Sequence, residues 1–441
     1  MHFDLILRNA KRIFPWGESL GDVAVQDGKI FSFLLGSQDT AENEIDLSGL
    51  YLLPGLIDSH VHLREPGKEE AETIATGSKG AALGGLTTIL DMPNNFPPTV
   101  DRTALAYKVK RAEENACVNI GFYIGASHAN LPHLAELETL DGVCGIKVFA
   151  GSSTGDLLIS DEEGLRTVLK TGHRRVAFHA EDEERLQERA SVYRIAGNPY
   201  HMHEIWRDTD CALLATKRIL KLSREERRPV HILHITTAQE MNLLKQHRDF
   251  ATCEVLANHL TLHSPECYDR LGGMAVLNPP LRGKEHQEAL WKGVREGQVD
   301  VISSDHAPHP LEAKEKEWAC CASGLTGIQT LVPIMLDHVS AGRLSLGRLV
   351  DLMAAGPARV YGMPTKGRLA VGFDADFTII DMQKKDKIFV KNLVSPCGWS
   401  PFDGKEIKGW PVMTIVNGQV VMRDNEIISS KVAGKLPLFL S

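Results

Sequence analysis

Apolar and polar residues alternate in short runs near both ends of the chain, as they do in strands with one buried face. Dipeptides typical of tight hairpin turns, Asp27-Gly28 and Asn417-Gly418, interrupt these regions. We therefore expect antiparallel strands at both ends, which can meet as one small composite β-sandwich. The alternating runs are residues 5–8, 23–25, 30–34, 376–381 and 412–416, the last continuing to Val420 and Val421.

Between these ends the pattern changes to continuous apolar runs separated by longer helical stretches, which is typical of parallel β/α units. The first and last runs lie about 250 residues apart, the usual span of a (β/α)₈ TIM barrel. This predicts an α/β fold with a barrel at residues 54–365, flanked by sandwich segments at 1–53 and 366–441. The eight runs are residues 52–58, 87–92, 118–126, 145–150, 176–180, 230–235, 252–256 and 299–304.

Composition narrows the function without identifying it. The 441 residues are 43% hydrophobic and 24% charged, ordinary values for a globular protein. A dispersed net charge of -8 offers no basic stripe for nucleic acid, and no apolar run is long enough for a membrane span. Eight cysteines without a CxxC pair, and an acid at Asp4 where a signal peptide would be basic, favour a cytoplasmic protein.

The candidate chemistry lies where the predicted barrel strands end, which is where this fold places its active sites. His60 and His62 follow the first strand, and their i, i+2 spacing points both imidazoles to one side. Two imidazoles on one rigid strand suit a divalent metal ion. An HxH pair alone is weak evidence, because such pairs also arise by chance.

Three further strand ends add residues of the same kind. His179 ends the fifth strand, His234 the sixth and Asp305 the eighth. Each has a common structural explanation by itself: a histidine can be satisfied in the core, and an aspartate can cap a helix. His231 lies on the same strand as His234 but farther from the strand end, and its position in the strand alternation suits the mouth less well. We expect it to pack or hydrogen-bond. The convergence of these positions on one barrel mouth predicts a metal centre.

Lys147 ends the fourth strand, and its ammonium would repel a metal ion. A lysine here is commonly a side chain that snorkels to solvent. Carboxylated by carbon dioxide, the same side chain becomes an anion that can bridge two metal ions. Such an anion is needed because four histidines and one aspartate supply too little negative charge for two cations.

With these residues in place, the sequence resembles the amidohydrolase superfamily, whose opening motif corresponds to Pro54-Gly55-Leu56-Ile57-Asp58-Ser59-His60-Val61-His62. Within that superfamily it is most similar to dihydroorotases. The motifs that carry this similarity are residues 62–67 (HLREPG), 92–95 (MPNN), 278–282 (NPPLR) and 304–309 (SDHAPH).

The resemblance implies two zinc ions per subunit. His60, His62 and Asp305 would hold one ion, His179 and His234 the second, and Lys147, as a carbamate, would bridge both. Some dihydroorotases bridge with an aspartate beyond this strand; here Asp156 is a distant alternative. Asp305 would also be the catalytic acid and base for the hydrolysis of a cyclic amide.

Substrate recognition is expected to involve a carboxylate, which dihydroorotate carries and a neutral hydantoin lacks. Arg64 can bind a carboxylate bidentately, although a surface arginine is an equally common occurrence. The resemblance adds Asn94 and His309 to this anion pocket. The resemblance also implies that the ring amide is bound by Asn278 and by the loop at Ser323 and Gly324.

Other functions stay open from the sequence. Allantoinases are the nearest alternative, because they share the barrel, the metals and an arginine after the HxH pair, and hydantoinases follow. Both families differ around Met92-Pro93-Asn94 and the motif that begins at Asp305. A binding scaffold derived from an enzyme would be expected to lose ligands, whereas all six ligand positions are filled here. We expect a small-molecule substrate and no nucleic-acid or membrane partner, with a homodimer as the default assembly.

Overall fold

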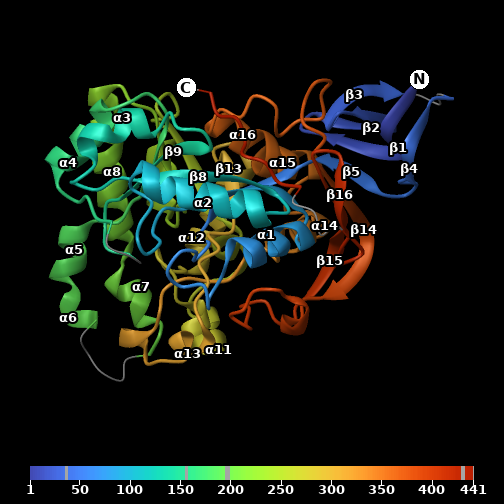
Figure 1. The fold of residues 1–441 in the computed structure, drawn as a ribbon. Coiled ribbons are helices and arrows are strands. Elements are labelled where there is room, and N and C mark those ends of the chain that lie inside the picture. Colours follow the sequence, from blue (N-terminus) through green and yellow to red (C-terminus); the bar gives the residue numbers. More distant parts are fainter. Residues whose placement is uncertain (35–37, 154–156, 194–198, 429–432, 441) are drawn as a thin grey trace.

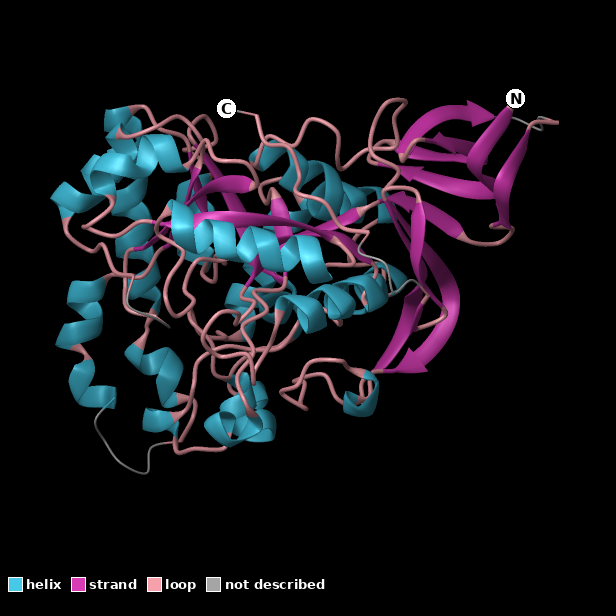
Figure 2. Ribbon diagram, viewed as in Figure 1, coloured by secondary structure: helices cyan, strands magenta, loops and turns pink. Residues whose placement is uncertain are grey.

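The computed structural model describes residues 1–34, 38–153, 157–193, 199–428 and 433–440. Its centre is a barrel of eight parallel strands that follow one another in chain order (Figures 1 and 2). The backbone N–H of His62 donates to His306 O at 2.7 Å, which links the first and last strands. The predicted barrel is confirmed. Its strands are β6 Leu56–Val61, β7 Leu86–Asp91, β8 Asn119–Gly125, β9 Val143–Phe149, β10 Val176–His179, β11 Val230–Ile232, β12 Ala251–Leu256 and β13 Val301–Ser303.

Helices cover the outside of this barrel, and side-chain caps fix where several of them begin. Thr73, Asp101, Asp161 and Asp208 each accept a hydrogen bond from a backbone N–H of the first helical turn. The longer helices are α1 Ile74–Leu83, α2 Arg102–Asn115, α4 Glu162–Lys170, α8 Thr209–Glu226, α12 Lys284–Arg295 and α14 Leu331–Ser340. The shorter ones are α3 Leu134–Leu137, α5 Glu183–Glu188, α6 Ala190–Tyr193, α7 Met202–Trp206, α9 Ala238–Leu244, α10 Ala257–Thr261, α11 Glu266–Leu271, α13 Leu311–Lys314, α15 Leu346–Val350 and α16 Gly356–Val360.

Strands from both ends of the chain form a second sheet beside the barrel, at the right of Figure 1. The N-terminal and C-terminal strands join where Pro54 pairs with Phe377 in an antiparallel ladder. Asp27-Gly28 and Asn417-Gly418 form the expected tight turns, with positive φ at all four residues. The sheet contains β1 His2–Phe14, β2 Gly17–Gln26, β3 Lys29–Leu34, β4 Thr40–Asp46, β5 Tyr51–Pro54, β14 Phe377–Lys387, β15 Glu406–Val416, β16 Gln419–Arg423 and β17 Glu426–Ile427.

The predicted first barrel strand, residues 52–58, is divided between the two sheets. β5 belongs to the terminal sheet, and the barrel strand β6 begins two residues after it ends. Gly55 makes this change possible, because a Cβ there would collide with Thr87 and Asp376. The apolar run is continuous across the change, so the hydrophobic pattern could not reveal it.

A buried polar cluster connects the terminal sheet to the barrel. Asp376 accepts hydrogen bonds from Lys366 Nζ at 2.6 Å, from Asn119 Nδ2 at 3.0 Å and from the backbone N–H of Asn417 at 2.8 Å. Near the end of the chain, Phe439 packs into the apolar cluster within the barrel. Among the described helices, none combines the length and apolar character that a membrane span requires.

Candidate active site

The barrel mouth brings most of the predicted site residues together. One pocket, of about 350 Å³ with its open mouth, is lined by eleven of the twelve. His309 is the exception: it lies beside Arg64, with its Nε2 3.3 Å from the guanidinium. Asp156 lies outside the described residues. The eleven are His60, His62, Arg64, Asn94, Lys147, His179, His234, Asn278, Asp305, Ser323 and Gly324.

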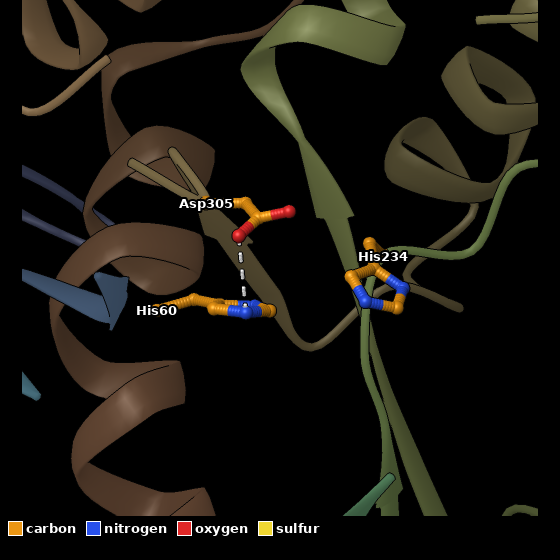
Figure 3. A group of neighbouring side chains, drawn as sticks. All are labelled: His60, His234 and Asp305. Atoms are coloured by element: carbon orange, nitrogen blue, oxygen red, sulfur yellow. Dashed lines mark ion pairs between the residues drawn. The ribbon is translucent and has the colours of Figure 1, made fainter. Parts of the chain in front are cut away.

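The imidazoles of His60 and His62 both face the carboxylate of Asp305. Their Nε2 atoms lie 3.2 and 3.1 Å from Asp305 Oδ1. His60, His234 and Asp305 each offer a ligand atom within 4.8 Å of the others, and Figure 3 shows these three side chains around a common space. This triple combines residues that the sequence resemblance assigned to two different ions, so the candidate ligands form one compact cluster.

The other ring nitrogen of several histidines is held by an acceptor outside the cluster. His62 Nδ1 lies 2.5 Å from Asn94 Oδ1, and His179 Nε2 lies 2.9 Å from Glu181 Oε2. An oxygen acceptor fixes the proton on the nitrogen that faces it, so the opposite nitrogen presents its lone pair to the pocket. His60 is oriented in the same way, by Glu254 Oε1 at 2.8 Å from its Nδ1.

Burial keeps these imidazoles neutral, which is the form that binds metal. It lowers the pKa of His60, His62 and His234 well below the usual value, and that of His179 to a lesser extent. Burial also raises the pKa of Glu254 to about 8. Burial therefore disfavours a charged group without a partner of opposite charge. A metal cation bound by these neutral imidazoles and the Asp305 carboxylate would have such a partner.

The backbone is strained at two of the candidate ligand positions. His234 has a φ of 36° and Asp305 a φ of 47°, a region that residues other than glycine rarely adopt. Each lies two residues after the end of a barrel strand, β11 or β13, and lines the pocket. Strain of this kind is typical of functional sites, where the surrounding structure must maintain it.

Glu181 contacts the ring nitrogen of His179 that points away from His234, and Arg207 pairs with Glu181. Arg207 is buried and forms an ion pair with Glu181 Oε2, and its Nη2 donates to Ser152 O at 2.7 Å. Burial alone would raise the pKa of Glu181, but the charge of Arg207 and the hydrogen bond from His179 lower it to about 2. Glu181 is therefore ionised at neutral pH and makes His179 a stronger electron donor.

Lys147 is almost fully buried at the end of β9, with its Nζ 4.7 Å from the centre of the Phe149 ring. Burial lowers its pKa to about 7, although the charges of Asp305 and Glu254 oppose this shift. A large share of this amine is therefore neutral at physiological pH, which is the form that reacts with carbon dioxide.

Arg64 is buried at one side of the pocket. Its Nε donates to Pro308 O at 2.9 Å, and burial lowers its pKa to about 10. Within the described part of the chain, no carboxylate oxygen lies within 4.0 Å of its nitrogens. A buried guanidinium without a carboxylate partner is costly unless a ligand supplies the anion.

The residues expected at the ring amide lie on two loops of the same mouth, Asn278 on one and the adjacent Ser323 and Gly324 on the other. His203 donates through Nε2 to Asn278 Oδ1 at 3.0 Å, which leaves the Asn278 amide group near Ser153. Gly324 has a φ of +146°, and a Cβ there would collide with Ala307 O. Lys314 fixes this loop by donating to Ala322 O and Gly324 O.

Several residues of the site were not predicted from the sequence. Glu181 and Glu254 contact the ring nitrogens of His179 and His60, while Phe149 and Ser153 line the pocket. Glu254 had a usable signal, since it is a lone acid within an apolar run and such residues are rarely buried without a partner. Outside the ligand set, His231 bonds to Thr252 Oγ1 at 2.8 Å, as expected for a packing residue.

Comparison with known proteins agrees with this geometry. Residues 51–421 match the model of the amidohydrolase family. The chain is 34% identical to a dihydroorotase from Methanothermobacter thermautotrophicus, with 97% of this chain and 96% of the relative covered. It is 35% identical to a dihydroorotase from Pyrococcus furiosus (92% and 90%) and 31% identical to an L-hydantoinase from Paenarthrobacter aurescens (97% and 96%).

Solved structures show the same architecture. The structure of an L-hydantoinase (dihydropyrimidinase) from Arthrobacter aurescens superposes with a TM-score of 0.93 at 30% identity, covering 98% of this chain and 99% of that one. A D-hydantoinase structure gives 0.90 at 27% identity, with 98% of each chain covered. From its sequence, its barrel and its site, this chain belongs to the amidohydrolase family.

Proposed function

We propose that the protein is a zinc-dependent dihydroorotase, which opens the cyclic amide of (S)-dihydroorotate to N-carbamoyl-L-aspartate and closes it again. The observation that carries this proposal is the buried guanidinium of Arg64, which lines the pocket without a carboxylate partner. A ring that bears a carboxylate supplies the missing anion, whereas a neutral hydantoin does not. The dihydroorotases among the relatives support the same choice.

The ligand cluster fits a pair of zinc ions. His179 Nδ1 lies 3.0 Å from His234 Nε2, and Asp305 Oδ1 lies 3.1 Å from His62 Nε2. Two ligands on one tetrahedral zinc ion are about 3.3 Å apart, as bond lengths of about 2.0 Å require. When bound, the two ions supply a water nucleophile at neutral pH and stabilise the oxyanion that develops on the amide carbon.

The side chains of the protein then orient the ring and move the proton. Arg64, Asn94 and His309 would bind the carboxylate, and Asn278, Ser323 and Gly324 would hold the ring amide. Asp305 would accept the proton of the attacking water and deliver it to the leaving ring nitrogen. Its position supports this role, because Asp305 Oδ1 lies 3.2 and 3.1 Å from the Nε2 atoms of His60 and His62, at the mouth where the substrate would bind.

Lys147 is proposed to carry the bridging carbamate. An ordinary lysine has a pKa near 10.5, so only about 0.03% of it is neutral at pH 7. With its pKa lowered to about 7, roughly half of the Lys147 amine can react with carbon dioxide. The reaction forms an N–C bond and releases one proton, and it puts an anion in the pocket that His60 and His179 also line.

Substrate preference tests the proposal against the hydantoinases and allantoinases. Hydrolysis of dihydroorotate, hydantoin and allantoin is compared at matched enzyme concentration, with product identified by chromatography. The proposal expects kcat/KM for dihydroorotate to exceed both others by at least about 10², given the worth of a charge-assisted contact. A preference for hydantoin or allantoin would reject it.

Metal analysis tests the remaining alternative, a scaffold without catalysis. We expect about two zinc ions per chain and loss of turnover after chelation. Zinc-free protein that neither binds the added metal nor turns over substrate would favour the scaffold. We further propose a cytoplasmic homodimer, which fractionation and sedimentation can check.

A further inference from the structure

The side chain of Asn95 holds the backbone on both sides of Arg64. Its Nδ2 donates to Leu63 O at 2.7 Å and to Glu65 O at 3.0 Å. Its Oδ1 accepts a hydrogen bond from Lys108 Nζ at 2.8 Å. Two carbonyls can only accept and an ammonium can only donate, so the orientation of this amide is determined by its three partners.

Lys108 and Asp91 anchor the amide from inside the protein. Both side chains are fully buried, and Lys108 Nζ lies 2.5 Å from Asp91 Oδ2. Lys108 Nζ also donates to Met92 O at 3.2 Å, so the ammonium has three oxygen partners. Asp91 Oδ1 in turn accepts the backbone N–H of Leu63 at 2.8 Å. The ion pair therefore connects the segment before Arg64 to the loop that follows β7.

We propose that Asn95, anchored by the Lys108–Asp91 ion pair, is a positioning residue that sets the place of Arg64 and thereby the recognition of the substrate carboxylate; this inference rests on the proposed function. Asn95 contacts the backbone of residues 63 and 65 and acts only through Arg64. Nothing in the reaction itself requires it. The binding of carboxylate-bearing rings depends on it, because a small displacement of a bidentate partner sharply weakens the interaction.

The substitution Asn95→Asp examines this role with almost no change of shape. The new carboxylate keeps an acceptor for Lys108, but it loses both donors and faces the carbonyls of Leu63 and Glu65. Asn95→Ala also removes the donors but introduces no repulsion. We expect KM for dihydroorotate to rise in the order wild type, alanine variant, aspartate variant, with at least about a tenfold increase in the last. The inhibition constant of orotate, which carries the same carboxylate, should rise by the same factor.

A loss of stability would give a different result. Misfolding reduces the amount of active enzyme, so it lowers apparent kcat and leaves KM unchanged. We expect kcat to fall by less than KM rises, with zinc content per folded chain preserved. Asn115→Asp is the matched control: Asn115 lies at the end of α2 and donates to Arg111 O at 2.9 Å. Its KM should equal that of the wild type.

The outcomes separate this inference from the proposed function. A wild-type protein that does not turn over dihydroorotate rejects the proposed function and the inference together, before any substitution is made. A wild type that is active, with Asn95→Asp and Asn95→Ala both folded and their KM within twofold of it, rejects the inference alone. A rise in KM and in the orotate inhibition constant, absent in Asn115→Asp, supports it.

Discussion

Replacing Arg64 with methionine should remove substrate recognition and leave the metal centre intact. Methionine fills much of the volume without the charge. Nε of Arg64 is already occupied by Pro308 O and Nη2 lies 3.3 Å from His309 Nε2, so Nη1 and the second N–H of Nη2 remain for a ligand. Two charge-assisted hydrogen bonds contribute roughly 1.5–3 kcal/mol each, or about 3–6 kcal/mol together. The lower value corresponds to a factor of about 150 in kcat/KM.

The assay is steady-state hydrolysis of dihydroorotate, with zinc content measured on the same samples. Arg64→Met should lose at least about 10² in kcat/KM, and Arg64→Lys should recover only part of it, because lysine lacks the planar pair of donors. Arg102→Met is the control, since Arg102 pairs with Glu136 on the surface. An Arg64→Met variant with full zinc and kcat/KM within tenfold of the wild type would refute the anion pocket.

Three further substitutions address the metal centre and the join between the two sheets. Lys147→Met should reduce bound zinc below two ions per chain and kcat by at least about 10³, as measured by elemental analysis and assay; unchanged zinc content would contradict the carbamate. Glu181→Gln should weaken zinc binding by roughly 10–100-fold in competition with a chelator, and equal affinity would show that Glu181 does not tune His179. Lys366→Met leaves Asp376 buried without its cation and should cost about 3–5 kcal/mol of unfolding free energy at pH 8. Asp376 and Asp374 raise the pKa of Lys366 above its usual 10.5, so the charged lysine stabilises the fold below pH 10.5. This stabilisation is lost as the pH rises through the pKa of the folded state. The difference in unfolding free energy between wild type and Lys366→Met, measured in urea, should therefore shrink at higher pH.

Much of the barrel could be predicted because its strands are buried on both faces. Each then appears as a continuous apolar run, and the order of the runs implies their neighbours. The same property hid the change of sheet at Gly55, where burial continues although the hydrogen-bond partners change. Only a close approach in three dimensions, to Thr87 and Asp376, distinguishes that position.

The pocket residues were predictable to the extent that they follow strands. His60, His179 and Asp305 occupy positions that the fold itself directs to one mouth, so local sequence was sufficient to bring them together. Asn95 and Lys108 meet only because α2 packs against the loop after β7, which no local pattern encodes. Glu181 could have been found, since it lies two residues after His179 with the same strand parity.

The most direct test of the account is the approach to equilibrium from both sides. Zinc-loaded protein is incubated with dihydroorotate or with N-carbamoyl-L-aspartate, and both compounds are followed by chromatography. Both mixtures should reach the same ratio, and chelation should stop both reactions. Failure to interconvert the two compounds, or equal rates in zinc-free protein, would contradict a zinc-dependent dihydroorotase.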